Sequence, residues 1–239
     1  MLDSLLKLNV KVFADGANLS DIETMNGNNL IQGLTTNPSL MKKAGVNDYR
    51  KFATEVLEIV NVKPISFEVF ADTLEEMEIQ AREISSWGKN VYVKIPISNT
   101  ANISSKKLIK KLTDEGIKLN VTAIMTPQQV LEINDSLNPD VPCFISIFAG
   151  RIADTGINPI PLIKESLQIL TSNPLAEVIW ASPRELLNIF QANEIGCHAI
   201  TATIDILSKI HLIGKDLNRY SLETVKMFHD DALSAGYEI

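Results

Sequence analysis

Short apolar runs alternate with longer segments of helical period along the whole chain. The runs are rich in Val, Ile and Phe, residues that favour β-strands. Eight runs of this kind begin at Val10, Asn29, Pro64, Asn90, Ile117, Val141, Ala176 and Cys197. The segments between them are amphipathic, as in TLEEMEIQAREISSW from Thr73. This alternation predicts stacked β/α units around a parallel sheet.

Capping signals predict where several helices begin and end. Gly116 and Gly196 close two of the amphipathic segments, and glycine is favoured just after a helix because it tolerates positive φ. A capping side chain followed by Pro suits the first turn of a helix. Such pairs occur at Thr126-Pro127, Asn158-Pro159 and Ser182-Pro183.

The number of repeating units decides between two α/β architectures. Eight β/α units in 239 residues match a closed (β/α)8 barrel of the usual size. A doubly wound open sheet is the alternative, but it normally has fewer strands and a Gly-rich first turn, which this sequence lacks. The sequence therefore predicts an α/β fold, a single-domain (β/α)8 TIM barrel over residues 1–239, with an extra C-terminal helix in a tail from about residue 221.

Composition and charge narrow the class of protein. The chain is 45% hydrophobic and 21% charged, and its formal net charge is −7. This acidic balance argues against binding to nucleic acid or to an anionic membrane, although it allows a local basic pocket for a small phosphate. Cys143 and Cys197 are too few for a disulfide framework and are expected to be reduced thiols. Since neither a membrane-spanning run nor a signal-peptide pattern is found, we expect a cytoplasmic protein.

Polar residues interrupt the apolar runs close to their C-terminal ends. In a (β/α)8 barrel these ends meet at one face, where the chemistry takes place. Successive side chains alternate across a strand, so Asn120 shares a face with Thr122, and Ser146 with Phe148. The candidates at this face are Asp15, Thr35, Asn37, Glu68, Lys94, Asn120, Thr122, Ser146, Phe148, Arg151, Ser182 and Arg184. Because six or seven strands contribute, we expect these residues to form one site.

Lys94 is the candidate with the most specific chemistry. It lies in VYVKIPI between Val93 and Ile95, and if these two pack against the helices, alternation places Lys94 inside the barrel. A lysine removed from water there can act as a neutral amine and attack a carbonyl carbon to form a Schiff base. The alternative is a lysine whose ammonium reaches solvent at the end of the strand.

Asp15 and Glu68 form a carboxylate pair on nearby strands and are candidates for general acid–base catalysis. Each also has a purely structural interpretation. Asp15 can cap a helix in DGAN, and Glu68 can form an ion pair with Lys94.

Two arginines are candidates for a phosphate site. Arg151 and Arg184 can hold a phosphate together with the hydroxyl of Ser182. Ordinary surface ion pairs are the alternative for both arginines. Asn37 also has a structural alternative, since it can simply start a turn before Pro38.

The sequence indicates neither a metal nor an organic cofactor. His198, His211 and His229 have no second ligand at metal-binding spacing. No Walker-type, GxGxxG or GxSxG motif occurs. We therefore expect no cofactor.

Several stretches taken together resemble the transaldolase family, and within it the short-chain branch that includes the fructose-6-phosphate aldolases. They are FADGAN, GLTTNPSL, VYVKIPIS, EGIKLNVTAIMTPQQ, CFISIFAGRIADTG and WASPREL. The resemblance runs from about Phe13 to Ile210. It implies the same (β/α)8 barrel that the count of β/α units predicts.

The resemblance implies catalytic roles for four residues. Lys94 matches the Schiff-base lysine, and Asp15 matches the carboxylate that exchanges a proton with the 4-hydroxyl of the substrate. Glu68 and Thr122 match the pair that holds a catalytic water during formation and hydrolysis of the imine.

Further matches are to positions that bind the substrate. Residues that hydrogen-bond the sugar hydroxyls correspond to Asn37, Asn120 and Ser146, with Thr35 beside them. The phosphate site corresponds to Arg151, Ser182 and Arg184.

The chain departs from its relatives at two positions. Gly16 follows the catalytic carboxylate where relatives usually carry Ser or Thr. Pro183 replaces a residue that is commonly aromatic or aliphatic, and because Pro fixes φ and lacks an N–H, it can change the direction in which Arg184 points.

Two other positions distinguish the two branches of the family. Phe148 and Glu68 match transaldolases, whereas the aldolase branch carries Tyr and Gln there.

The resemblance implies a metal-free transaldolase that moves a dihydroxyacetone unit from fructose 6-phosphate or sedoheptulose 7-phosphate to an aldose phosphate. One alternative is an aldolase that releases free dihydroxyacetone, and another is a sugar-phosphate-binding barrel without activity. The expected partners are small-molecule sugar phosphates, with no nucleic acid and no membrane. Relatives of this length form symmetric oligomers through the C-terminal helix, so a homo-oligomer is expected.

Overall fold

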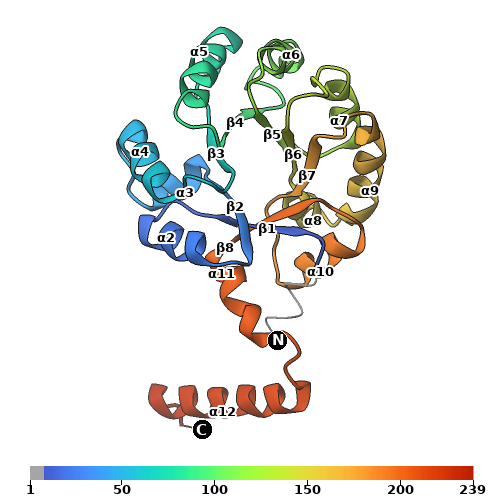
Figure 1. Cartoon of the computed structure of the whole chain (residues 1–239). Coiled ribbons are helices and arrows are strands. Elements are labelled where there is room, and N and C mark those ends of the chain that lie inside the picture. Colours follow the sequence, from blue (N-terminus) through green and yellow to red (C-terminus); the bar gives the residue numbers. More distant parts are fainter. Residues whose placement is uncertain (1–7, 239) are drawn as a thin grey trace.

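A closed barrel forms the centre of the computed structural model, which describes residues 8–238. Eight parallel strands follow one another around it in chain order, and the last strand pairs with the first (Figure 1). The strands are β1 (Lys11–Asp15), β2 (Ile31–Thr35), β3 (Ile65–Glu68), β4 (Val91–Pro96), β5 (Leu119–Ile124), β6 (Cys143–Ile147), β7 (Ala176–Trp180) and β8 (Ala199–Thr203). Each coincides with one of the eight apolar runs, so the predicted (β/α)8 barrel is confirmed.

Helices form an outer layer around the strands (Figure 1). They are α2 (Leu19–Gly27), α3 (Pro38–Lys43), α4 (Tyr49–Ile59), α5 (Leu74–Ser85), α6 (Lys106–Asp114), α7 (Pro127–Asn134), α8 (Ala149–Asp154), α9 (Pro159–Ile169), α10 (Leu187–Glu194) and α11 (Ile204–Leu207). Two short 3-10 helices, η1 (Leu170–Ser172) and η2 (Ser208–Leu212), extend α9 and α11, and the chain closes with α12 (Leu217–Ala235).

Local side-chain chemistry explains most of the helix boundaries. The Thr126 side chain and Gln129 form a reciprocal capping box at the start of α7, and Asn158 caps α9. Gly116 and Gly196 adopt positive φ, +81° and +75°, just after α6 and α10. These predicted signals are confirmed.

The helix start predicted at Ser182-Pro183 is wrong. Ser182 has φ +58°, and α10 begins several residues later. The Ser182 carbonyl packs so closely on Gly150 that a Cβ at this glycine would lie 1.6 Å from the carbonyl oxygen. α10 has no side-chain cap, and the Asn188 side chain within it instead holds the preceding loop by accepting a hydrogen bond from the Arg184 N–H at 2.8 Å. Long-range packing at the mouth of the barrel therefore overrides the local signal.

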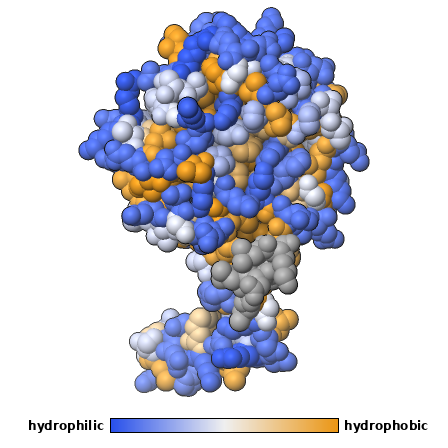
Figure 2. Space-filling view, in the orientation of Figure 1, coloured by the Kyte–Doolittle hydropathy of each residue, from blue (hydrophilic) through white to orange (hydrophobic). Residues whose placement is uncertain are grey.

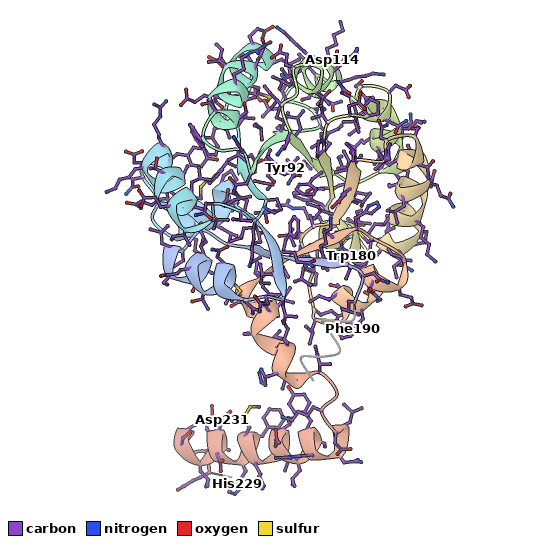
Figure 3. The ribbon with its side chains drawn as sticks, viewed as in Figure 1. Tyr92, Asp114, Trp180, Phe190, His229 and Asp231 are labelled. Carbon is purple, nitrogen blue, oxygen red and sulfur yellow. The ribbon has the colours of Figure 1, made fainter. Side chains whose placement is uncertain are left out.

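The core has two parts, one on each side of the strands. Outward-facing residues such as Val93 and Ile95 are fully buried against the helices. The apolar side chains that fill the inside of the barrel are those of Phe13, Tyr92, Phe144, Ile179 and Ala199 (Tyr92 is labelled in Figure 3). Gly33 makes room for them, because a Cβ there would lie 2.6 Å from the Phe13 ring. Toward the C-terminal ends of the strands, polar side chains replace this apolar filling.

The last helix, α12, stands clear of the barrel (Figures 1 and 2). It begins at Leu217, whereas the sequence suggested a tail from about residue 221. None of its residues is buried, and Figure 3 shows its side chains, including His229 and Asp231, projecting from an isolated helix. Large apolar side chains are exposed on it at Leu217, Leu222, Val225, Phe228 and Leu233. Figure 2 shows hydrophobic surface at several places along this helix.

Two further expectations concern the cysteine thiols and membrane-spanning helices. Cys143 and Cys197 are both free and buried, and burial raises the pKa of each thiol to about 12. Across residues 8–238, no helix is both long enough and apolar enough to cross a lipid bilayer.

Candidate active site

A cavity of about 610 Å³ opens at the C-terminal ends of the barrel strands. Most of the candidates from the sequence line it. They are Asp15, Thr35, Asn37, Glu68, Lys94, Thr122, Ser146, Phe148, Arg151, Ser182 and Arg184. The exception is Asn120, which is fully buried beneath the cavity and reaches it only through a neighbour.

Lys94 points into the barrel and is only 7% exposed. Its Nζ lies 3.3 Å from Glu68 Oε2 and donates a hydrogen bond to the Thr36 carbonyl at 3.1 Å. The register pairs Glu68 with Lys94 across β3 and β4, so the two side chains lie on the same inner face. The amine is therefore held inside the barrel rather than extended to solvent, and the ion pair considered for Glu68 is present.

Asp15 ends β1 and is held by two donors. Thr35 donates to Oδ1 at 2.8 Å, and the side-chain amide of Asn37 donates to Oδ2 at 3.0 Å. Burial raises the pKa of Asp15, although the charge of Lys94 and these two hydrogen bonds act against the shift. Asp15 does not cap α2, because Asn18 does so.

Asn37 and Thr35 connect Asp15 to the rest of the rim. Asn37 also starts the turn into α3, since its Oδ1 caps this helix by accepting from the Leu40 N–H at 2.9 Å. The Thr35 hydroxyl lies 2.6 Å from that of Thr201. A hydroxyl has one proton to donate, and Thr35 uses it on Asp15, so Thr201 is the donor in this second contact.

Asn120 orients Ser146 from below. The Ser146 hydroxyl donates to Asn120 Oδ1 at 2.7 Å, and the Asn120 amide donates to the Ser66 hydroxyl at 2.9 Å. Ser146 lines the cavity. Because its hydroxyl proton is donated to Asn120, the hydroxyl oxygen can only accept hydrogen bonds from a ligand.

Thr122 presents a buried hydroxyl that bonds to no other group among the described residues. The backbone around it is irregular, since the pairing of β5 with β6 shifts between Val121 and Ile124, and Ala123 has φ +61°. Bulges of this kind redirect side chains next to active sites. The arrangement leaves an unused donor and acceptor at the wall of the cavity.

The two arginines lie on the outer side of the cavity. The Arg151 guanidinium lies 5.6 Å from the centre of the Phe148 ring. Arg184 is half exposed and forms an ion pair with Asp154, with Nε donating to Oδ1 at 3.1 Å and Nη2 contacting Oδ2. The surface ion pair considered for Arg184 is therefore present, and the same residue still lines the cavity.

Several residues at or near this site were missed by the sequence reasoning. Thr201 and Thr203 line the cavity from β8, and their spacing of two in AITAT is the signal that could have found them. Tyr49, whose hydroxyl bonds to the backbone of Glu68, and Asp154 come from helices and have no comparable signal.

Within residues 8–238, no group of three or more histidine, cysteine and carboxylate side chains is placed to hold a metal ion. The chemistry available in the cavity is that of one amine, two carboxylates, several hydroxyls and two guanidinium groups.

Comparisons with known proteins point to one family. Residues 12–238 match the family described as Transaldolase/Fructose-6-phosphate aldolase. A "probable transaldolase" of Methanococcus maripaludis is 35% identical over 202 residues, which are 84% of this chain and 89% of that protein. Another, of Thermoanaerobacter sp. strain X514, is 32% identical over 231 residues, or 96% of this chain and 100% of that protein.

Solved structures with much lower sequence identity share the fold. The structure of a "putative lyase/mutase" from Burkholderia cenocepacia J2315 has a TM-score of 0.57 with this chain at 12% identity. The match covers 99% of this chain and 87% of that one. It shows the similarity of the barrels alone.

Proposed function

The chain belongs to the transaldolase/fructose-6-phosphate aldolase family, and on this basis we propose that it is a transaldolase that transfers a dihydroxyacetone unit between sugar phosphates through a Schiff base on Lys94. The observation that carries the proposal is the Lys94 amine, 3.3 Å from the Glu68 carboxylate at the cavity. Desolvating such a pair has a large energetic cost, and a protein that only binds sugar phosphates has no use for it. The pair therefore favours catalysis over a binding barrel without activity.

Formation of the imine uses Lys94, Glu68 and Thr122. The Lys94 amine attacks the C2 carbonyl carbon of the donor ketose phosphate, and the carbonyl oxygen then leaves as water. Glu68 relays the protons of these steps through a water held between its carboxylate and the Thr122 hydroxyl. The Thr122 hydroxyl supports this role, because a buried hydroxyl without a protein partner is suited to bind a water.

Cleavage and transfer use Asp15. Asp15 accepts the proton of the 4-hydroxyl as the C3–C4 bond breaks, and the electron pair of that bond moves into the iminium to give an enamine. The raised pKa of Asp15 suits a group that accepts a proton and later returns it. The enamine then attacks the aldehyde carbon of an acceptor aldose phosphate, Asp15 returns the proton to the new hydroxyl, and hydrolysis of the imine frees Lys94.

Arg151 and Arg184, with the Ser182 hydroxyl, would hold the substrate phosphate. In the structure, Arg184 contacts Asp154. An exposed ion pair of this kind contributes at most about 1 kcal/mol, and a phosphate is a stronger partner for a guanidinium, so the phosphate can displace the carboxylate.

Transfer is favoured over release of free dihydroxyacetone by the ring of Phe148. Release requires water to reach the enamine and protonate it before an acceptor arrives. Phe148 lines the cavity with an apolar ring that has no hydroxyl to orient such a water. A drier environment should lengthen the life of the enamine until an acceptor captures it.

Borohydride trapping tests the proposal directly. Reduction of the protein with borohydride in the presence of fructose 6-phosphate should add a dihydroxyacetone-derived mass to the intact chain, and the Lys94→Met variant should gain none. Addition of erythrose 4-phosphate without borohydride should yield sedoheptulose 7-phosphate. A chain that gains no mass, or a Lys94→Met variant that still does, contradicts the Schiff base on Lys94. Rapid release of dihydroxyacetone without an acceptor would replace the transferase with an aldolase.

We also propose that the protein acts in the cytoplasm as a homo-oligomer, with no nucleic acid or membrane as partner. The net charge of −7 supports the absence of polyanionic partners. The apolar side chains that α12 exposes support its docking on another copy of the chain. Analytical ultracentrifugation should give a multiple of 26.4 kDa, and Phe228→Glu should lower it. A monomeric wild-type protein at micromolar concentration would contradict the assembly.

A further inference from the structure

The strands β2 and β3 separate before β3 reaches Glu68. The last backbone hydrogen bond between them runs from the Thr36 N–H to the Ser66 carbonyl at 3.2 Å, after which β2 turns into α3. Alternate residues of a strand in a parallel sheet bond to opposite neighbours, and Val69 bonds to β4 at 3.0 Å. The N–H and C=O of Glu68 therefore face the side that β2 has already left.

The Tyr49 hydroxyl takes the place of the missing strand. It accepts a hydrogen bond from the Glu68 N–H at 2.9 Å and donates one to the Glu68 carbonyl at 3.1 Å. Its ring packs edge-on against Phe67, Phe70 and Trp87, with ring centres 6.2, 4.5 and 5.6 Å away. Burial raises the pKa of Tyr49 well above its usual value, so the phenol keeps the proton that it donates.

We infer that Tyr49 is a positioning residue: by holding the backbone of Glu68, it fixes the Glu68 carboxylate beside the Lys94 amine. Glu68 is the last residue of β3 and is paired there with β4 alone, so its backbone needs a second support. Tyr49 is not among the described residues that line the cavity, and it therefore acts through Glu68. The inference rests on the proposed function, because the position of Glu68 affects turnover only if the Lys94 chemistry takes place.

The expected signature is a loss of rate without a loss of binding. Glu68 is proposed to move protons during formation and hydrolysis of the imine, whereas the sugar and its phosphate are bound by other residues. A misplaced carboxylate slows proton transfer and leaves ground-state binding nearly unchanged. The effect should therefore fall on kcat and not on KM.

The test compares Tyr49→Phe with a matched control. Tyr49→Phe keeps the ring and removes only the hydroxyl, and we expect kcat to fall about tenfold with KM changed less than about twofold. Trp87→Phe disturbs the same aromatic cluster without touching the Glu68 backbone and should keep kcat within about twofold. A double-mutant cycle with Glu68→Gln completes the test: once the carboxylate is gone, removal of the Tyr49 hydroxyl should change kcat less than about twofold.

A second variant covers the case in which Tyr49→Phe folds poorly. Asp48 caps α4 by accepting from the Lys51 N–H at 3.0 Å on the exposed side of the helix. Asp48→Ala should loosen the helix turn that carries Tyr49 and lower kcat about two- to threefold, again at constant KM.

Three outcomes would overturn the inference. They are a Tyr49→Phe variant with wild-type kcat, an equal loss in Trp87→Phe, and an undiminished effect of Tyr49→Phe in the Glu68→Gln background. Failure of the proposed function is a separate result, since it shows in the wild-type protein as an absence of borohydride trapping.

Discussion

Thr122→Val should make the protein more stable and less active. The Thr122 side chain is 1% exposed, and its hydroxyl bonds to no other described residue. A buried hydroxyl without a hydrogen bond costs about 1–3 kcal/mol, and Val replaces it with a methyl group of similar size. Allowing for a water that partly satisfies the hydroxyl, we expect the free energy of unfolding to rise by about 1 kcal/mol. For a chain of this length, that corresponds to an increase in Tm of about 2–4 °C.

Activity should move in the opposite direction. Without the hydroxyl, the water proposed to relay protons between Glu68 and the imine loses one of its two hydrogen-bond partners. General acid–base catalysis contributes about 10²–10⁴-fold to a rate, so a partial loss of about 10- to 100-fold in kcat is expected. Differential scanning calorimetry and a coupled assay with fructose 6-phosphate and erythrose 4-phosphate measure the two effects.

Thr201→Val is the matched control for this prediction. Thr201 is also a buried threonine of the barrel interior, 6% exposed, but its hydroxyl donates to Thr35 at 2.6 Å. Its removal should lower the free energy of unfolding by about 1 kcal/mol. If Thr122→Val lowers Tm as much as Thr201→Val does, then the Thr122 hydroxyl has a partner in the protein and the reasoning fails.

Further predictions concern the amine, the selectivity and the pH dependence. Lys94→Met should abolish turnover and borohydride trapping while the far-UV circular dichroism stays unchanged; trapping that persists would place the Schiff base elsewhere. Phe148→Tyr should raise the share of free dihydroxyacetone among the products measured by mass spectrometry, and an unchanged share would show that the ring does not control access of water. Asp154→Asn should lower KM for fructose 6-phosphate about two- to fivefold, because Arg184 loses a competing anion worth at most about 1 kcal/mol; a higher KM would mean that Asp154 aims the guanidinium. The raised pKa of Asp15 means that the folded state binds a proton more tightly than the unfolded state, so its contribution to stability is present below pH 3.8 and is lost as the pH rises through the raised pKa. Tm of the wild type relative to Asp15→Asn should therefore fall as the pH rises above about 4, and a difference that does not change with pH would contradict the shift.

Much of the barrel follows from short-range patterns in the sequence. Each apolar run became a strand because alternation and β-propensity act over neighbouring residues. The same alternation predicted that Lys94 points inward, since Val93 and Ile95 lie on the side that faces the helices. Capping at Thr126 and Asn158 was equally predictable, because a cap bonds to an N–H only two or three residues away.

The partners of the site residues were not predictable in this way. The sequence placed Asn120 with the sugar-binding residues, but closure of the barrel puts it under Ser146 and out of the cavity. Arg184 could be identified as a cation near the phosphate site, whereas its contact with Asp154 depends on how α8 and the loop after β7 meet.

The eight strands, the inward direction of Lys94 and the helix starts at Pro127 and Pro159 could be predicted from the sequence, because they depend on interactions within one turn or one strand. The positive φ of Ser182 and the hydrogen bonds by which Tyr49 completes the edge of β3 could be found only in the folded chain. Each of these follows from the separation or close approach of segments that are distant along the chain. Hydrogen-bond partners inside a closed barrel are set by strand register and by the places where neighbouring strands part, so they depend on how segments distant along the chain come together.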